Sequence, residues 1–200
     1  LKDSFPSANW LLLSEESAKT QLKEGFPLKG EWLWILDPLD GTKDFLNGTG
    51  EYAVHLGLLY KNIPIFGIVL LPEAEELWCG IVGQGAWCEK RNGEKINYDF
   101  SSRGKIEELI LVSSRNHRDE RLENLIKNIP ISSSKSLGSV GCKIVSILKG
   151  DSDFYISLSG ETAPKDWDMA APEALLKAAG GKFTHADRKN LKYNNGNTLQ

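Results

Sequence analysis

The first half of the chain alternates short apolar runs with short polar connections. A buried-strand candidate at Glu31–Asp37 is followed by further apolar or β-rich runs at Tyr52–Tyr60, Ile65–Leu71, Leu77–Val82 and Gly85–Glu89. The connections between these later runs contain Pro, Gly, Asn and Glu, and Pro, Gly and Asn favour turns. Strands separated by such short turns pair with their neighbours in sequence, so this half is predicted to form an antiparallel meander.

The second half mixes strands with helices. Strands are predicted at Glu107–Ser113, Phe154–Leu158 and Lys182–His185, and helices at Asp119–Asn128, Gly141–Lys149 and Asp168–Ala179. In the last helix we expect Asp168 at the N-cap, Pro172 within the first turn, and the following Gly-Gly pair to end it. The sequence thus predicts an α+β protein with an antiparallel half over residues 1–105 and an α/β half over residues 106–200.

Composition and charge exclude several classes of protein. The chain has 200 residues, of which 40% are hydrophobic and 26% charged, as in ordinary globular domains. Its longest apolar stretch, Ile63–Leu71, contains Pro and Gly and is far shorter than the roughly 20 residues of a membrane helix, so no membrane partner is expected. A net charge of −3 gives no footprint for a nucleic-acid polymer. Three scattered cysteines and the lack of a signal-peptide pattern predict a reduced, cytoplasmic protein.

The most informative polar segment is Asp37-Pro38-Leu39-Asp40-Gly41-Thr42, at the end of the first strand candidate. Two carboxylates held so close repel each other, and a hard cation relieves that repulsion. Taken singly, this loop is more typical of a turn or helix start, Glu15–Glu16 of a solvated pair, and Asp168 of an N-cap. Together, the four acids at the edges of apolar elements are candidates for a site that holds two or three Mg²⁺ ions, binds a phosphoryl group and activates water.

Three segments resemble the signature segments of the inositol monophosphatase superfamily. They are Ser14–Ser17, Trp34–Phe45 and Trp167–Ala174. The distance in sequence from Glu15 to Asp37 is also similar to that in the family, and the resemblance covers nearly the whole chain. It implies an α+β layered αβαβα sandwich of the inositol monophosphatase/fructose-1,6-bisphosphatase type. It also implies a Mg²⁺-dependent, lithium-sensitive phosphatase.

The resemblance carries roles over to individual positions. The expected metal ligands are the side chains of Glu15, Asp37, Asp40 and Asp168 and the backbone carbonyl of Leu39. Gly41 and Thr42 fall where the family contacts the phosphate. Thr42 also matches the threonine that orients the attacking water, so Thr42 and Asp40 are the expected catalytic residues. The alternative for Thr42 is a plain turn or capping role.

Motif variants favour the 3′(2′),5′-bisphosphate nucleotidase, or CysQ-like, branch, which belongs to sulfate assimilation. Lys43–Phe45 stands where simple inositol monophosphatases tend to have Thr-Asn-Phe, and Lys165–Asp168 resembles the Lys-Trp-Asp segment of the nucleotidases. Two further elements of the branch place nucleotide contacts at positions matching Ser114, His117, Ser139 and Lys143. The branch has Gly at position 139, so only a backbone contact carries over there. On their own these residues read as a surface histidine, a helix N-cap and a solvated lysine.

The expected reaction is removal of the 3′-phosphate from adenosine 3′,5′-bisphosphate, with its 5′-phosphosulfate form as a second substrate. Two alternatives stay open. Glu161 stands where inositol monophosphatases place a glutamate that binds a substrate hydroxyl, which keeps inositol and other sugar phosphates as an alternative class. The other alternative is a non-catalytic homologue that holds metal and nucleotide. Compared with the family, the chain is expected to be truncated at both ends, without the N-terminal helices and the aspartate that partners the threonine.

Overall fold

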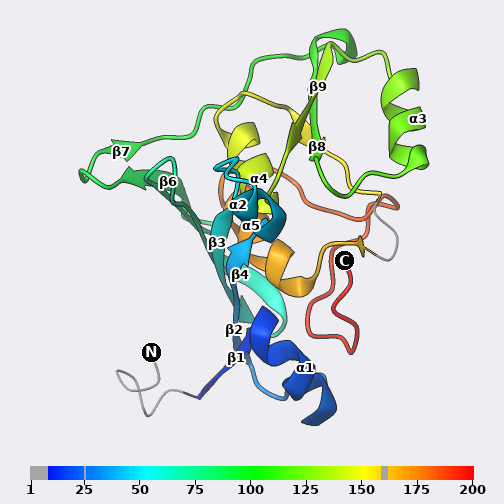
Figure 1. Cartoon of the computed structure of the whole chain (residues 1–200). Coiled ribbons are helices and arrows are strands. Elements are labelled where there is room, and N and C mark those ends of the chain that lie inside the picture. The colour runs from blue at the N-terminus through cyan, green and yellow to red at the C-terminus, as the bar shows by residue number, and fades with distance from the viewer. Residues whose placement is uncertain (1–8, 25, 159–161) are drawn as a thin grey trace.

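A computed structural model gives the fold of residues 9–24, 26–158 and 162–200. Helix α5 (Asp166–Ala178) packs against a seven-stranded sheet, and α4 (Val140–Leu148) packs between α5 and a three-stranded sheet (Figure 1). Helix α3 (Glu120–Asn128) lies on the far side of the smaller sheet from α4. This layered α+β arrangement confirms the predicted fold class. No helix of the described residues is long and apolar enough to cross a membrane.

The larger sheet contains the predicted meander. Its strands, in both sequence and spatial order, are β1 (Trp10–Ser14), β2 (Trp32–Asp40), β3 (Ala53–Tyr60), β4 (Ile63–Leu71), β5 (Glu76–Ile81), β6 (Gly85–Lys90) and β7 (Lys95–Ile96). Strand β1 is parallel to β2, and every other pair is antiparallel. The two residues between β3 and β4, Lys61 and Asn62, both have positive φ, as in the tight turns that match the twist of a hairpin. The meander prediction is therefore confirmed for β2 to β7, whereas the parallel pairing of β1 departs from the predicted antiparallel half.

The smaller sheet is parallel, with the order β10–β8–β9, and differs in part from the prediction. Its strands are β8 (Ile110–Ser114), β9 (Ser133–Leu137) and β10 (Phe154–Tyr155). The predicted strand Glu107–Ser113 begins later, because a 3₁₀ turn occupies Ile106–Glu108. The strand predicted at Phe154–Leu158 has only two residues, and Lys182–His185 is not a strand. In that last segment only Phe183 is buried, and its ring packs in the core from an irregular loop.

Helix α5 begins two residues before the predicted start, which corrects the place of two residues. Lys165 is the N-cap, and Asp168 is the third helical residue, where its carboxylate accepts the backbone N–H of Lys165 at 2.7 Å. A capping carboxylate inside the first turn thus replaces the expected N-cap side chain. Pro172 consequently lies in the second turn and not the first. It has no N–H to donate to the Asp168 carbonyl, one helical turn before it.

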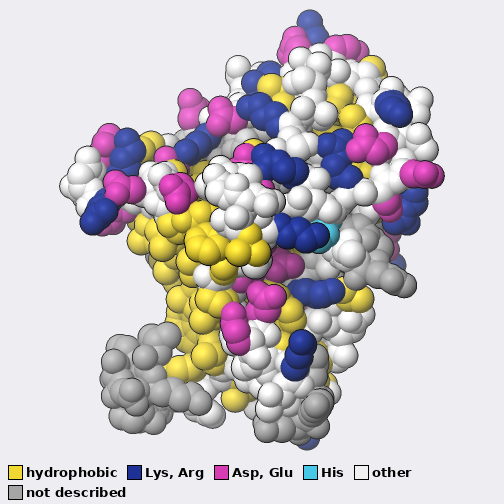
Figure 2. Space-filling view, viewed as in Figure 1, with side chains coloured by type: hydrophobic (Ala, Val, Ile, Leu, Met, Phe, Trp, Pro, Cys, Tyr) yellow, Lys and Arg dark blue, Asp and Glu magenta, His cyan; other side chains and the backbone are white. Residues whose placement is uncertain are grey.

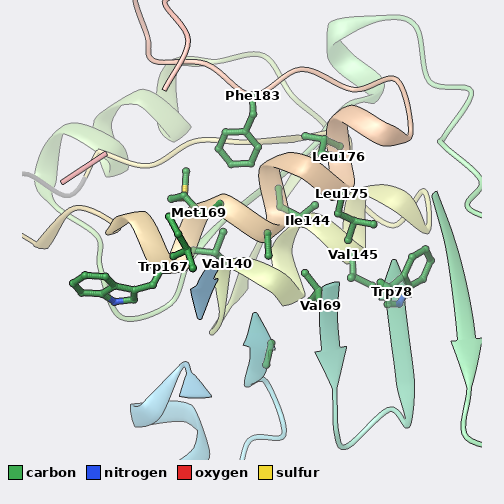
Figure 3. Packing of buried hydrophobic residues seen from close by; sticks show 14 of the residues in the cluster. Val69, Trp78, Val140, Ile144, Val145, Trp167, Met169, Leu175, Leu176 and Phe183 are labelled. Atoms are coloured by element: carbon green, nitrogen blue, oxygen red, sulfur yellow. The ribbon is translucent and has the colours of Figure 1, made fainter. Parts of the chain in front are cut away.

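The core forms where α5 lies on the larger sheet. Figure 3 shows Val69 and Trp78 of the sheet close to Val145 of α4 and Leu175 of α5. Glycines in the middle of the central strands allow α5 to approach closely: a Cβ on Gly67 would lie 2.2 Å from the Ala171 carbonyl oxygen. This contact fixes the height of α5, and therefore of Asp168 at its N-terminal end, above the sheet.

Replacing Gly67 by Ala is expected to lower the free energy of unfolding by about 2 kcal/mol or more, because backbone atoms on both sides must move apart. Urea unfolding followed by circular dichroism measures the change. Gly104→Ala is the matched control, since no heavy atom lies within 4 Å of the added methyl group and the backbone there is unstrained. Equal effects of the two substitutions would contradict this account of the packing.

Candidate functional site

Residues from both sheets line one cavity of about 260 Å³. Figure 2 shows acidic side chains in the middle of this face of the molecule, with a band of Lys and Arg side chains and a histidine above them. The cavity brings together most of the site residues expected from the sequence: Glu15, Asp37, Leu39, Asp40, Gly41, Thr42, Ser114, His117, Lys143 and Asp168. Residues far apart in the sequence therefore form one site.

Asp37, Asp40 and Asp168 form its acidic centre. One carboxylate oxygen from each lies within 4.8 Å of the others. Each carboxylate is also held by one backbone N–H: that of Leu39 on Asp37 at 2.9 Å, that of Val140 on Asp40 at 2.6 Å, and that of Lys165 on Asp168.

A bulge in β2 places the first two of these acids on one face. Residues three apart in a regular strand point to opposite faces of the sheet. Here Asp37 pairs with His55 of β3, whereas Asp40 pairs with Ala53, so three steps along β2 match two along β3. The extra residue turns Asp40 to the same side as Asp37. The strand was predicted to stop at Pro38, but it continues to Asp40, because a bulge tolerates proline.

Glu15 joins the cluster through the pairing of β1 with β2. It is the first residue of α1 (Glu15–Glu24), directly after β1, and the β1 residue before it, Ser14, pairs with Leu36. Because the two strands are parallel, their carboxyl ends meet at one edge of the sheet. Glu15 and Asp37 therefore follow their strands at the same place.

Burial and mutual repulsion govern the charges of this cluster. The side chain of Asp37 is almost fully buried, and burial together with the charges of Asp40 and Asp168 raises the pKa of Asp37. Burial and Asp40 likewise raise the pKa of Asp168. Burial and the neighbouring Glu16 raise that of Glu15. In the described part of the chain no Lys or Arg forms an ion pair with these acids. Closely spaced hard oxygen ligands without a compensating cation fit a divalent metal ion such as Mg²⁺.

The loop after the acids is built for a close turn. Gly41 has a φ of 88°, which favours glycine, and immediately precedes the short helix α2 (Thr42–Leu46). A Cβ there would lie 3.0 Å from the carbonyl oxygen of Glu51. The hydroxyl of Thr42 donates to the Leu39 carbonyl oxygen at 3.2 Å, and both residues line the cavity.

The opposite wall carries Ser114, His117 and Lys143. Lys143 is not a solvated helix lysine: its side chain is buried, and its ammonium donates to the carbonyl oxygens of Gly138 at 2.5 Å and Leu137 at 3.4 Å. The backbone N–H of His117 donates to the Ser114 hydroxyl at 3.0 Å. His117 is exposed at the rim of the cavity, yet partial desolvation of its imidazole, with the charges of nearby lysines, lowers its pKa. This wall is polar and partly basic.

Among the described residues, one expected site residue, Ser139, does not line the cavity. Ser139 caps α4, with its hydroxyl accepting the Cys142 N–H at 3.3 Å and its own N–H donating to the Glu51 carbonyl oxygen. Its side chain thus takes the N-cap role that the sequence left open, and it is not among the cavity-lining residues. Glu161 lies outside the described residues.

Several cavity residues were not singled out from the sequence. Lys43 and Asn116 lie next to predicted site residues within the same motifs, so the sequence could have indicated that they line the cavity. Tyr155, at the end of β10, has no local signature. His55 lies behind the acids, fully buried, with Nε2 3.5 Å from Asp40 Oδ2. Its place behind Asp40 follows only from the pairing of β2 with β3.

The chain matches the Inositol monophosphatase family over residues 1–199 and belongs to this family. A 3′(2′),5′-bisphosphate nucleotidase CysQ from Buchnera aphidicola subsp. Acyrthosiphon pisum is 35% identical over 160 residues, which make up 80% of this chain and 57% of that protein. The chain thus spans little more than half the length of this relative. The recurrence of CysQ proteins among its relatives supports the CysQ-like branch.

Solved structures agree with this placement. The crystal structure of CysQ from Bacteroides thetaiotaomicron, a bacterial member of the inositol monophosphatase family, has a TM-score of 0.79 and 26% identity, covering 99% of this chain and 77% of that one. An IMPase/NADP phosphatase complexed with Mg²⁺ and phosphate has a TM-score of 0.75 and 26% identity, covering 96% of this chain and 67% of that one. The acidic cluster and these likenesses together indicate a divalent metal site.

Proposed function

We propose that this protein is a Mg²⁺-dependent phosphatase that hydrolyses the 3′-phosphate of adenosine 3′,5′-bisphosphate, with the 5′-phosphosulfate form as a second substrate, and acts in sulfate assimilation. The observation that carries the proposal is the division of one cavity into an uncompensated acidic centre and a partly basic opposite wall. A substrate with two separated phosphates fits such a cavity, because each phosphate needs its own source of positive charge. The CysQ likeness supports the same substrate class.

The residues that would hold the metal are Glu15, Asp37, Asp40 and Asp168, with the Leu39 carbonyl oxygen. When bound, two or three Mg²⁺ ions supply charge stabilisation to the phosphoryl group and make a water molecule more acidic. The hydroxyl of Thr42 donates a hydrogen bond to the Leu39 carbonyl oxygen, so the hydroxyl oxygen can accept a hydrogen bond from that water and orient it. Water attacks phosphorus and the bond to the 3′-oxygen breaks. The 3′-oxygen leaves protonated, as the hydroxyl of AMP.

His117→Ala is expected to weaken hydrolysis of adenosine 3′,5′-bisphosphate selectively. Loss of a hydrogen bond to a charged phosphate costs about 1.5–3 kcal/mol, or roughly 10–100-fold in kcat/KM. Hydrolysis of inositol 1-phosphate, which has no second phosphate, should change less than about 3-fold. Phosphate release from both substrates with Mg²⁺, measured side by side, gives the comparison. His185→Ala is the matched control, since His185 is exposed and away from the cavity.

Phosphate release by the wild-type protein from the two substrates distinguishes the proposed activity from its alternatives. Preference for inositol 1-phosphate would contradict the nucleotidase proposal and favour an inositol or sugar monophosphatase, which the likeness to an IMPase/NADP phosphatase supports. Glu161 would then become the first residue to replace, because it is the predicted ligand of a substrate hydroxyl. Calorimetric binding of the bisphosphate without phosphate release would indicate a non-catalytic homologue.

A further inference from the structure

A buried carboxylate in the lining of the cavity connects segments that are distant in the sequence. Asp44 of α2 is only 1% exposed. It accepts hydrogen bonds from Arg115 Nη1 at 2.5 Å, from Asn116 Nδ2 at 2.7 Å and from Thr49 Oγ1 at 3.1 Å. Arg115 and Asn116 lie in the loop after β8, in the smaller sheet. Asp44 therefore joins the loop of the acidic centre to the opposite wall.

A second carboxylate completes this bridge. Glu51 accepts from Arg115 Nη2 at 2.7 Å and from the backbone N–H of Gly138 at 2.8 Å. A Cβ on Gly138 would lie 2.5 Å from Asp44 Cγ, so the turn before α4 lies directly against the Asp44 carboxylate. Three segments thus share one polar cluster: helix α2, which follows Gly41, the loop after β8 that contains Arg115 and His117, and the turn before α4.

The position of this cluster matters for the length of the substrate. Asp40 and Thr42 lie two to four residues before Asp44, whereas His117 lies two residues after Arg115. The Asp44–Arg115 contact therefore sets the distance from the reacting end of the cavity to its far wall. A substrate that touches both ends depends on this distance, because small errors of position in a preorganised site cost substantial rate. A monophosphate held only at the acidic centre does not.

We propose that Asp44 is a positioning residue that sets the spacing of the two ends of the cavity and thereby determines selectivity for substrates with a second, distant phosphate. The inference rests on the proposed function, since it names the feature that selects the substrate class. Asp44 acts through Arg115 and Asn116 and needs no contact with the substrate. Its carboxylate is held in place by burial and by donors from two segments.

The test is Asp44→Asn, which keeps the shape of the side chain and removes its charge. One oxygen that accepted a hydrogen bond becomes an NH₂ group facing donors, so the bridge opens. We expect kcat/KM for adenosine 3′,5′-bisphosphate to fall roughly 30-fold, mainly through KM, and that for inositol 1-phosphate to fall less than about 3-fold. Thr49→Val is the matched control. It removes the hydrogen bonds of the Thr49 hydroxyl with Asp44 and with the Glu51 N–H but none of those that Arg115 makes.

Arg115→Met is a second test of the bridge in case Asp44→Asn does not fold. Arg115 is partly exposed, so its loss is tolerated more easily. It should cause the same selective rise in KM, and the double variant should be no worse than the more impaired single variant. Equal losses for both substrates, additive effects, or unchanged selectivity would overturn the positioning role.

Binding measurements separate this inference from the proposed function. If the wild-type protein does not hydrolyse the bisphosphate, the proposed function fails. The role of Asp44 is then read from calorimetry in the presence of Mg²⁺. Asp44→Asn should weaken binding of adenosine 3′,5′-bisphosphate roughly tenfold or more and binding of inorganic phosphate less than about 3-fold. Equal changes in the two dissociation constants would contradict the positioning role without reference to catalysis.

Discussion

Asp37→Asn is expected to reduce kcat for phosphate release about a thousand-fold or more, with the folded structure retained. Asparagine has the shape of aspartate but lacks the negative charge that holds a divalent ion. Loss of a metal that stabilises the transferring phosphoryl group costs several kcal/mol, and each 1.4 kcal/mol is about a factor of ten in rate. Phosphate release at saturating substrate, over a range of Mg²⁺ concentrations, measures the change.

Asp119→Asn provides the control for this substitution. Asp119 caps α3, away from the cavity, and asparagine is an equally good N-cap, so kcat should stay within about twofold. If Asp37→Asn kept its activity within tenfold of the wild type, the acidic centre would not be the metal site. The acidic centre would also not be the metal site if a high Mg²⁺ concentration restored the full rate of the variant by saturating a weak site elsewhere.

The same substitution is expected to stabilise the metal-free protein. Burial and neighbouring carboxylates raise the pKa of Asp37 above its usual value of 3.8, so the folded state favours the protonated form. The stability that this carboxyl contributes is present below about pH 4 and is lost as the pH rises through its raised pKa. Near pH 8, Asp37→Asn removes the cost of either protonating this carboxyl or burying its charge. Because each unit of pKa corresponds to about 1.4 kcal/mol, we expect a gain of at least about 2 kcal/mol.

Thermal unfolding of the metal-free proteins at several pH values tests this expectation. For a chain of this length, 1 kcal/mol corresponds to about 2–4 °C in Tm. The Tm of Asp37→Asn should exceed that of the wild type at about pH 8, and the difference should shrink towards zero near pH 4. Mg²⁺ should raise the wild-type Tm at about pH 8 and have a smaller effect on the variant. A variant less stable than the wild type at every pH would contradict the electrostatic account.

The expected loss of activity and the expected gain in stability of Asp37→Asn together describe a site whose function lowers the stability of the fold. The carboxylates of Asp37, Asp40 and Asp168 lie close together without an ion-pair partner among the described Lys and Arg residues, which is unfavourable in the folded chain. They are held in place by the packing of α5 and by backbone N–H groups. Functional sites commonly carry such local cost, and the rest of the fold offsets it.

The sequence predicted the acidic centre because its residues lie in compact segments, each next to a strand or helix that the apolar pattern reveals. It did not predict how Asp37 and Asp40 reach the same face, because this depends on a bulge that only the pairing with β3 defines. The start of α5 was misplaced for a related reason. An aspartate before a helix pattern is usually an N-cap, whereas here it caps from inside the first turn.

Long-range contacts were beyond the reach of the sequence. Asp44 was part of a recognised motif, but its partners Arg115 and Asn116 are 71 and 72 residues away. Nothing local distinguishes a buried bridging carboxylate from a solvated one. The same applies to Lys143, for which the sequence left a nucleotide contact and a solvated helix lysine open. Its burial and its hydrogen bonds to the carbonyl oxygens of Gly138 and Leu137 have no local signature.

The seating of α5 on the glycines of the larger sheet has a consequence for how the protein changes over evolution. Asp37, Asp40 and Asp168 all belong to that one locked unit, whereas Ser114 and His117 belong to the smaller sheet. Substitutions that accumulate in the smaller sheet can reshape the far wall of the cavity while the acidic centre keeps its geometry. Because the acidic centre and the far wall belong to different sheets, one fold can acquire new phosphate esters as substrates without changes to its reactive centre.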